Sequence, residues 1–247
     1  MNLEKQIYWL IYEKYQGKIT PRALKDIEKL KQGYPLNYLI GWTKFLDVIT
    51  DLRHKPFIPR PETEYWAEKV LKDMPLNQKL KCLDMFSGSG CLGLAILKNR
   101  PKIQMDFAEI NSQFIKQIKI NLKINHLNRC RSRVIQTNVW RKIQDQYDLI
   151  LANPPYISFK NKKKIQKEVL KYEPPAAYFS PQNGLYHIKT FLKQLKNHLK
   201  IGGRCYLEFG FGQKRIIAKL LKQFGFKKFC FYQDQYQRWR YVVIFNN

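Results

Sequence analysis

The sequence predicts an α/β fold in which a mostly parallel sheet carries helices on both faces, preceded by a small helical segment. From residue 79 onward, short apolar runs rich in β-branched and aromatic residues alternate with segments of helical periodicity. Such alternation is typical of strand–helix–strand units and of a sheet buried on both faces. With 247 residues, 45% of them hydrophobic, the chain can form one full-sized domain and a small appendage.

The first quarter of the chain reads as two helices, a hairpin and an extended linker. Apolar residues recur at helical spacing over 3–15, and Thr20-Pro21 is a helix-start signal for a second helix that Gly33 can end. Residues 37–53 are rich in β-branched and aromatic residues, which favours a hairpin. The prolines of residues 57–64 then force an extended path before the next helix.

The remaining elements follow from the alternation of patterns. Expected strands cover residues 80–86, 103–109, 132–137, 147–153, 203–210, 226–233 and 239–246. Expected helices cover residues 91–99, 111–123, 184–200 and 213–224, with Gly202-Gly203 as the stop of the third. The last two strands are joined by a short link, so we expect them to be antiparallel neighbours. We divide the chain into residues 1–36, 37–61 and 62–247.

The composition excludes several classes of protein. No apolar stretch approaches the roughly 20 residues that a membrane-spanning helix needs. The first fifteen residues carry charges among their apolar positions, which argues against a secretory signal. The five cysteines contain no C-x-x-C pair and the four histidines lack metal-ligand spacing, so we expect neither a disulfide framework nor a metal site. We expect a cytoplasmic protein that makes no membrane contact.

The chain is strongly basic, with 45 lysines and arginines against 19 acidic residues and a net charge of +26. Such a field attracts polyanions, which predicts a weak attraction to RNA or to the ribosome. A biased nucleotide composition that enriches lysine, asparagine, isoleucine and tyrosine would produce the same charge without a function. Both interpretations stay open at this stage.

A glycine-rich turn follows the strand at 80–86. Ser87-Gly88-Ser89-Gly90 lies between this strand and a helix, where glycines let the backbone approach a ligand closely. Glu109 ends the next expected strand, where a carboxylate can accept hydrogen bonds from ribose hydroxyls. The pattern favours a nucleoside ligand. Gly88, Gly90 and Gly93 also match the G-x-G-x-x-G fingerprint of NAD-binding folds, so the turn alone leaves both cofactors open.

Asn153-Pro154-Pro155-Tyr156 follows the strand at 147–153 and suits an exposed –NH2 group. Asn153 offers a side-chain carbonyl, Pro154 a backbone carbonyl, and Pro155 keeps the backbone extended. Tyr156 can stack on a planar group and favour a nearby positive charge. The conjugated nitrogen of an amide is a poor nucleophile, so aligning its lone pair with a donor carbon would supply most of the acceleration. The combination predicts methyl transfer to a planar nitrogen with Asn153, Pro154 and Tyr156 as catalytic residues.

These residues resemble the protein-(glutamine-N5) methyltransferases, which act on the glutamine of the GGQ loop in peptide-chain release factors. The resemblance covers nearly the whole chain. Its motifs are Ile58-Pro59-Arg60-Pro61-Glu62-Thr63-Glu64, the turn from Asp84 to Gly90, Asn153-Pro154-Pro155-Tyr156, Tyr172-Glu173-Pro174 and Glu208-Phe209-Gly210 with Gln213.

The resemblance implies a seven-stranded class I methyltransferase fold of Rossmann-like type, with S-adenosylmethionine as methyl donor. It implies a release factor as partner and a contact between that partner and residues 1–36. The cofactor residues that it implies are Phe86, Ser87, Gly88, Ser89, Gly90, Glu109, Asn138, Val139, Trp140 and Asn153, with the ribose on Glu109 and the adenine near 138–140. The glutamine amide would lie on Asn153, Pro154, Pro155 and Tyr156.

Three departures from the family pattern stand out. Phe86 occupies a position where many relatives have a small residue. Asn138 and Val139 replace an acidic and bulky pair, which leaves Trp140 one place out of register. The helical region before the hairpin is about half the usual length.

Two other acceptors stay open: an exocyclic amine of DNA or RNA, and a glutamine of a ribosomal protein. We expect a monomer. Arg60 and Glu62 could shape a lid over the cofactor or pin the linker through an ion pair, whereas we expect Glu208 and Gln213 to be structural. Six lysines could steer an acidic partner to the acceptor site or form a solvated face: Lys160, Lys162, Lys163, Lys164, Lys167 and Lys171.

Overall fold

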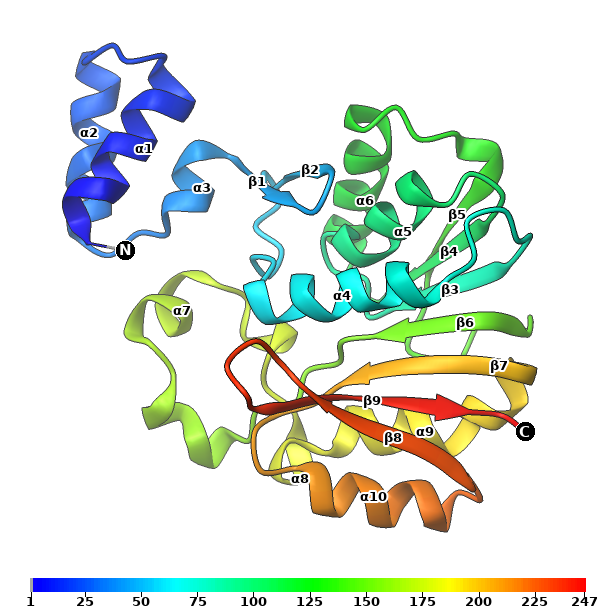
Figure 1. The fold of residues 1–247 in the computed structure, drawn as a ribbon. Coiled ribbons are helices and arrows are strands. Elements are labelled where there is room, and N and C mark those ends of the chain that lie inside the picture. The colour runs from blue at the N-terminus through cyan, green and yellow to red at the C-terminus, as the bar shows by residue number, and fades with distance from the viewer. Residues whose placement is uncertain (1) are drawn as a thin grey trace.

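A seven-stranded sheet forms the centre of the molecule, for which a computed structural model describes residues 2–247 (Figure 1). The strand order across the sheet is β5-β4-β3-β6-β7-β9-β8. The strands are β3 (Lys81–Met85), β4 (Gln104–Glu109), β5 (Ser132–Gln136), β6 (Tyr147–Ala152), β7 (Leu199–Glu208), β8 (Lys228–Gln233) and β9 (Trp239–Phe245). β3 to β7 pair in parallel, and β9 is antiparallel to both β7 and β8, so both predictions about strand direction are confirmed.

Helices cover both faces of this sheet, as the sequence predicts. They are α4 (Pro61–Asp73), α5 (Cys91–Asn99) and α6 (Ser112–Ile124) on one face, and α9 (Tyr186–His198) and α10 (Lys214–Gln223) on the other (Figure 1). One apolar cluster joins the buried side chains of α4, α5 and α6 to the sheet, and a second joins those of α9 and α10 to its opposite face. The sheet is therefore the middle of three layers.

The direction in which the chain crosses the sheet reverses between β3 and β6. From β3 the chain moves outward through β4 to β5, then returns to place β6 on the other side of β3. In open α/β sheets a crevice forms at this point, beyond the carboxyl ends of the strands. The glycine-rich turn follows β3 and the Asn-Pro-Pro-Tyr segment follows β6, so the topology brings the two motifs together.

A small helical unit precedes the sheet. It consists of α1 (Leu3–Tyr15), α2 (Pro21–Lys31) and α3 (Leu36–Ile40), which share an apolar cluster centred on Leu10, Leu30 and Leu39. Its charged centre is Asp26, which accepts hydrogen bonds from Lys14 Nζ at 2.7 Å and from the hydroxyl of Tyr15 at 2.7 Å. The unit lies to one side of the main domain, beside the short helix α7 (Lys167–Tyr172) (Figure 1).

Two expected boundaries are wrong. The hairpin consists only of β1 (Trp42–Phe45) and β2 (Val48–Asp51), because residues 36–40 form α3. Gly202-Gly203 does not stop a helix: α9 ends at His198, and β7 runs through both glycines. Gly202 N donates to Asn246 O at 2.7 Å and Gly203 O accepts from Asn246 N at 3.1 Å, which extends the sheet past them.

Short helical turns connect β6 to α9: η2 (Phe159–Lys164), η3 (Pro175–Ala177) and α8 (Pro181–Gly184), with η1 (Arg129–Arg131) before β5. Across residues 2–247 the structure contains no helix long and apolar enough to cross a membrane. In the same residues no group of three or more histidine, cysteine, aspartate or glutamate side chains is arranged to hold a metal ion.

Candidate active site

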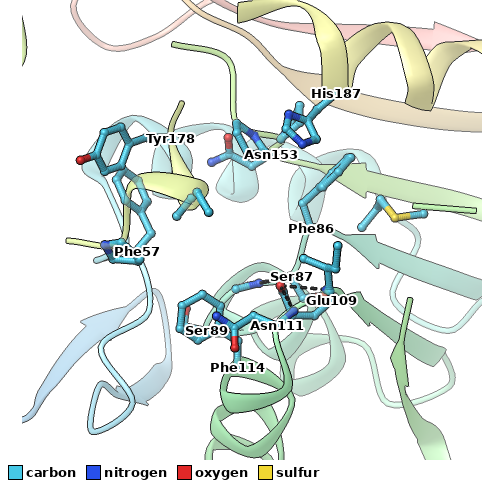
Figure 2. Close-up of a pocket in the computed structure, with 18 of the residues that line it drawn as sticks. Phe57, Phe86, Ser87, Ser89, Glu109, Asn111, Phe114, Asn153, Tyr178 and His187 are labelled. Carbon is cyan, nitrogen blue, oxygen red and sulfur yellow. Dashed lines mark hydrogen bonds between the residues drawn. The ribbon is translucent and has the colours of Figure 1, made fainter. Parts of the chain in front are cut away.

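A pocket with a cavity volume of about 360 Å³ opens beyond the carboxyl ends of β3, β4 and β6. Its wall includes the turn after β3, the end of β4, the Asn-Pro-Pro-Tyr segment after β6 and the linker before α4. Figure 2 shows Glu109 and Asn153 on opposite sides of this space, with Phe86 between them and Phe57 and Tyr178 along a third side. The pocket thus joins the two motifs that the sequence singled out.

The turn after β3 is built around the buried carboxyl group of Asp84. Its Oδ2 accepts a hydrogen bond from Gly93 N at 3.0 Å, whereas Oδ1 has no hydrogen-bond partner within the described chain. Burial, with the nearby charge of Glu109 adding to it, raises the pKa of Asp84 to about 7. A side chain on Gly93 would come within 2.4 Å of Phe107, so glycine there lets α5 pack directly on the sheet.

Two residues of the pocket wall, Phe86 and Val139, have left-handed backbone conformations, with φ of 63° and 46°. For residues other than glycine this conformation costs roughly 1–2 kcal/mol, and such strain gathers at binding sites. The Phe86 ring lies edge-on to His187, with the centroids 6.2 Å apart. The bulky residue at position 86 therefore stands where the backbone itself favours glycine.

Glu109 is held by three backbone N–H groups. Gly88 N donates to Oε2 at 2.9 Å, while Ile110 N and Asn111 N donate to Oε1 at 2.9 and 2.8 Å (Figure 2). Burial raises the pKa of Glu109 above its usual range, and these hydrogen bonds oppose that rise. A carboxylate offers about four acceptor sites, so one site on Oε2 remains for a ligand. The same side chain joins the glycine turn to the start of α6.

Asn153 and Pro154 leave β6 with two carbonyl oxygens at the pocket. Asn153 Nδ2 donates to Thr63 Oγ1 at 3.2 Å. Within residues 2–247 no donor reaches Asn153 Oδ1 or the backbone oxygen of Pro154. Both residues line the cavity, so the two oxygens are available to an N–H donor there.

Tyr156 is fixed from several directions. Its hydroxyl donates to Glu208 Oε1 at 2.9 Å, and its backbone oxygen accepts from Gln213 Nε2 at 2.9 Å. A side chain on Gly184, where φ is +85°, would lie 2.1 Å from that backbone oxygen. Gln213 is structural, as expected, and Gly184 is required for the close approach.

The rim of the pocket is closed by an ion pair between Arg60 and Glu173. Arg60 NH2 lies 2.6 Å from Glu173 Oε1, and Ile58 N donates to the other carboxylate oxygen at 3.1 Å. The Arg60 guanidinium also lies 4.3 Å from the centroid of the Phe57 ring. An ion pair does pin the linker, but the partner of Arg60 is Glu173 rather than Glu62.

The pocket brings together most of the residues expected at the site. They are Phe86, Ser87, Gly88, Ser89, Glu109, Asn138, Val139, Asn153, Pro154, Pro155 and Tyr156. Gly90 and Trp140 lie elsewhere. Gly90 is the N-cap residue of α5, with φ of +81°, and a side chain there would come within 3.2 Å of Ile118.

Trp140 belongs to the core and not to the expected adenine site. Its Nε1 donates to Phe191 O at 2.9 Å, and its ring stacks on His198 with centroids 4.4 Å apart. The left-handed conformation of Val139 turns the chain so that residues 138 and 139 line the cavity while residue 140 points into the core.

Sequence reasoning missed several residues of the site, and three of them stand out. Phe114 on α6 and His187 on α9 line the cavity, and Thr63 on α4 lines it while bonding to Asn153. Burial lowers the pKa of His187, and its Nδ1 lies 2.8 Å from Ser180 Oγ. Helical periodicity marks positions 114 and 187 only as parts of helices, whereas Thr63 lay inside a quoted motif without a stated role.

The sequence is similar to several known methyltransferases. Residues 66–176 match the family model described as the methyltransferase small domain. A release factor glutamine methyltransferase of Lactococcus lactis is 32% identical, and the match covers 92% of this chain and 84% of the relative. One of Mycoplasma mycoides is 31% identical, with 99% of this chain and 89% of the relative covered.

Solved structures with the same fold are more distant in sequence. A ribosomal protein L11 methylase from Lactobacillus delbrueckii subsp. bulgaricus superposes with a TM-score of 0.56 at 16% identity, over 78% of this chain and 80% of that one. A methyltransferase from Pyrococcus furiosus gives 0.55 at 16% identity, over 77% and 88% of the two chains. These likenesses establish a class I methyltransferase fold. The level of identity and coverage shared with the bacterial relatives shows that this chain belongs to the release factor glutamine methyltransferase family.

Proposed function

We propose that this protein transfers a methyl group from S-adenosylmethionine to the side-chain amide nitrogen (N5) of a glutamine in a protein, and that its substrate is the GGQ-loop glutamine of a peptide-chain release factor. One observation carries the proposal. The oxygens of Asn153 and Pro154 face the same pocket as the glycine-rich turn and Glu109, and no donor of the described chain occupies them. A primary carboxamide supplies two N–H groups, which match two acceptors.

The residues around Glu109 fit the nucleoside part of the cofactor. The free acceptor site on Glu109 Oε2 suits a ribose hydroxyl, and the turn at Ser87 to Ser89 lets a ligand approach the backbone. Phe114 and Val139 offer apolar surface to an adenine ring, and Asn138 offers hydrogen-bonding groups. Trp140 has no part in this site.

The acceptor residues would activate the amide by holding it. Hydrogen bonds to two carbonyl oxygens raise electron density on the nitrogen and fix its orientation, and the Tyr156 ring limits the tilt of the planar group. When bound, S-adenosylmethionine supplies an electrophilic methyl group on a sulfonium centre. The methylated nitrogen loses a proton after transfer, so these residues need not include a general base.

The family relationship supports the release factor as partner, because the relatives are named for it. Methyl transfer to a ribosomal-protein glutamine or to a nucleic-acid amine would use the same two oxygens, those of Asn153 and Pro154. The acceptor is therefore identified by a direct assay. A cytoplasmic location follows from this substrate. The monomeric state, the division at residues 36 and 61, and the contact between residues 1–36 and the release factor stay predictions.

The test is incubation of the purified protein with methyl-labelled S-adenosylmethionine and one candidate acceptor at a time: release factor, ribosomal proteins or RNA. We expect label in the release factor, on the GGQ-containing peptide. A release factor with that glutamine replaced by asparagine is the matched control and should stay unlabelled. Label in RNA or a ribosomal protein, with none in the release factor, would overturn the proposed substrate.

A further inference from the structure

The buried carboxylate of Glu208 gathers three hydrogen-bond donors beside the acceptor site. Glu208 ends β7 and is 2% exposed. Its Oε2 accepts from Thr63 Oγ1 at 2.8 Å and from Trp66 Nε1 at 2.7 Å, and its Oε1 accepts from the Tyr156 hydroxyl at 2.9 Å. Burial raises the pKa of Glu208 above its usual range. The three hydrogen bonds, together with the positive charge of Arg240 on β9, oppose that rise and favour the ionised form.

This arrangement sets the direction of the hydrogen bond between Thr63 and Asn153. The Thr63 hydroxyl has one proton, and an ionised carboxylate can only accept, so that proton points toward Glu208. Thr63 Oγ1 then presents only lone pairs to Asn153, whose Nδ2 lies 3.2 Å away. A reversed Asn153 carboxamide would place its carbonyl oxygen against those lone pairs.

We propose that Thr63 and Glu208 are positioning residues that fix the orientation of the Asn153 carboxamide, so that Oδ1 rather than Nδ2 faces the acceptor amide. The inference rests on the proposed function, because it assigns Asn153 to the acceptor. In the reverse orientation the Asn153 –NH2 would meet the substrate –NH2, and two donors cannot pair.

Glu208 also holds the other end of the tetrapeptide through the Tyr156 hydroxyl. One carboxylate therefore orients the hydrogen-bonding group at position 153 and the aromatic face at position 156. Thr63 lies in the first turn of α4, within Pro61-Glu62-Thr63-Glu64, and brings a hydroxyl group to Asn153 at the end of β6.

If the cluster around Glu208 served stability alone, substitutions of Trp66 and of Thr63 would slow methyl transfer equally. Trp66 therefore distinguishes a structural role from a positioning role. Its indole donates to the same Glu208 oxygen and its ring packs against Tyr206 and Tyr241. Within the described chain it makes no hydrogen bond to the tetrapeptide. Trp66→Phe removes one donor from Glu208 and leaves the Thr63 bond to Asn153 in place.

The experiment compares Thr63→Val, Thr63→Ser and Trp66→Phe with the unchanged protein. Single-turnover methyl transfer at saturating cofactor and acceptor is measured beside the cofactor Kd and the Tm. Thr63→Val should slow transfer roughly 100-fold, the loss typical of removing one oriented hydrogen-bonding group, with the cofactor Kd unchanged within about threefold. Thr63→Ser restores the hydroxyl and should recover transfer to within about fivefold of the original rate.

Trp66→Phe should lower the Tm while leaving the transfer rate within about threefold, because its bond lies outside the Thr63–Asn153 pair. Glu208→Leu is a second, independent variant. It removes the acceptor of the Thr63 hydroxyl and frees that proton to point toward Asn153, so transfer should slow at least as much as in Thr63→Val.

Equal rates in Thr63→Val and the unchanged protein would overturn the proposal, as would equal slowing by Thr63→Val and Trp66→Phe. The comparison can be made with any amine or amide acceptor that the enzyme methylates. A protein inactive on release factor but active on another acceptor would reject the proposed substrate, while the ratio of the Thr63 variants would still test the orientation of Asn153.

Discussion

Arg60 and Glu173 join two segments that lie 113 positions apart, with Arg60 NH2 and Glu173 Oε1 separated by 2.6 Å. The Glu173 side chain is 2% exposed and the Arg60 side chain 31%. The pair connects the proline-rich linker to the loop that follows the acceptor tetrapeptide. Both segments form part of the pocket wall, so this contact closes one side of the site.

Glu173→Ala should destabilise the fold by roughly 1–3 kcal/mol, because Ile58 N loses its buried acceptor and the partly exposed Arg60 loses its carboxylate partner. Urea unfolding gives the change in free energy. Lys31 and Glu28 form an exposed pair at 2.7 Å, and Glu28→Ala is the matched control with an expected loss below about 1 kcal/mol. Equal losses in the two variants would contradict the role of Glu173.

Asn153→Ala should reduce methyl transfer by at least about 100-fold, because the acceptor nitrogen loses one of its two carbonyl partners. The cofactor Kd should change less than about threefold, since Glu109, the proposed partner of the ribose, lies on the opposite side of the pocket. Isothermal titration with S-adenosylmethionine and a labelled-methyl assay measure the two quantities. A loss of cofactor affinity as large as the loss of rate would show that Asn153 serves the cofactor first.

Asp84→Asn should change how stability depends on pH. Burial raises the pKa of Asp84 from 3.8 to about 7, so between these values the folded protein holds a proton that the unfolded chain has lost. Stability from this group is therefore fully present below about pH 4 and lost as pH rises through 7, a change of about 4 kcal/mol. Asparagine does not titrate, so the stability difference between variant and wild type should shift in favour of the variant from pH 5 to pH 8.

Urea unfolding of both proteins at several pH values measures this difference. Asp47→Asn, at an exposed position in the turn of the hairpin, makes the same substitution at the surface and is the matched control. A constant difference between Asp84→Asn and wild type across this range would show that Asp84 is ionised in the folded protein.

The lysines at 160, 162, 163, 164, 167 and 171 are exposed, and within residues 2–247 none of them forms an ion pair. If they steer the protein partner, Lys160→Glu with Lys163→Glu should lower kcat/KM at low salt. The effect should shrink at about 0.5 M salt, where exposed charges are screened within a few ångströms. The control is Lys219→Glu with Lys222→Glu on α10, which changes the net charge of the protein by the same amount. The same loss in both double variants would indicate a general effect of charge.

Much of the site could be predicted because its signals are local. The strand at 147–152 and the tetrapeptide after it are adjacent in sequence, and so are the strand at 81–85 and its glycine turn. Topology then places both at one edge of the sheet. The contacts missed are those between distant positions: Thr63 and Glu208 lie 145 positions apart, and no periodic pattern reports that they meet.

Other sequence predictions were wrong because the same residues are compatible with two different structures. Gly202-Gly203 fits a helix stop, yet both residues lie in β7, because pairing with Asn246 offers their backbone groups partners. Trp140 fits an adenine-stacking residue, yet the backbone turn at Val139 directs it into the core. In each case the decision depends on tertiary contacts that a single sequence does not contain.

Asn153 and Tyr156 are held in place by hydrogen bonds to Thr63 on α4 and to Glu208 on β7. Under the proposed function, Asn153 and Pro154 contact only the carboxamide group of the substrate. An unhindered primary amide on any protein would then fit, provided that it reached the pocket. Selectivity among substrate proteins would then depend on the surface around the pocket entrance, where the substrate protein contacts the enzyme. Changing the substrate protein would therefore require substitutions on that surface, while the residues of the pocket could stay the same.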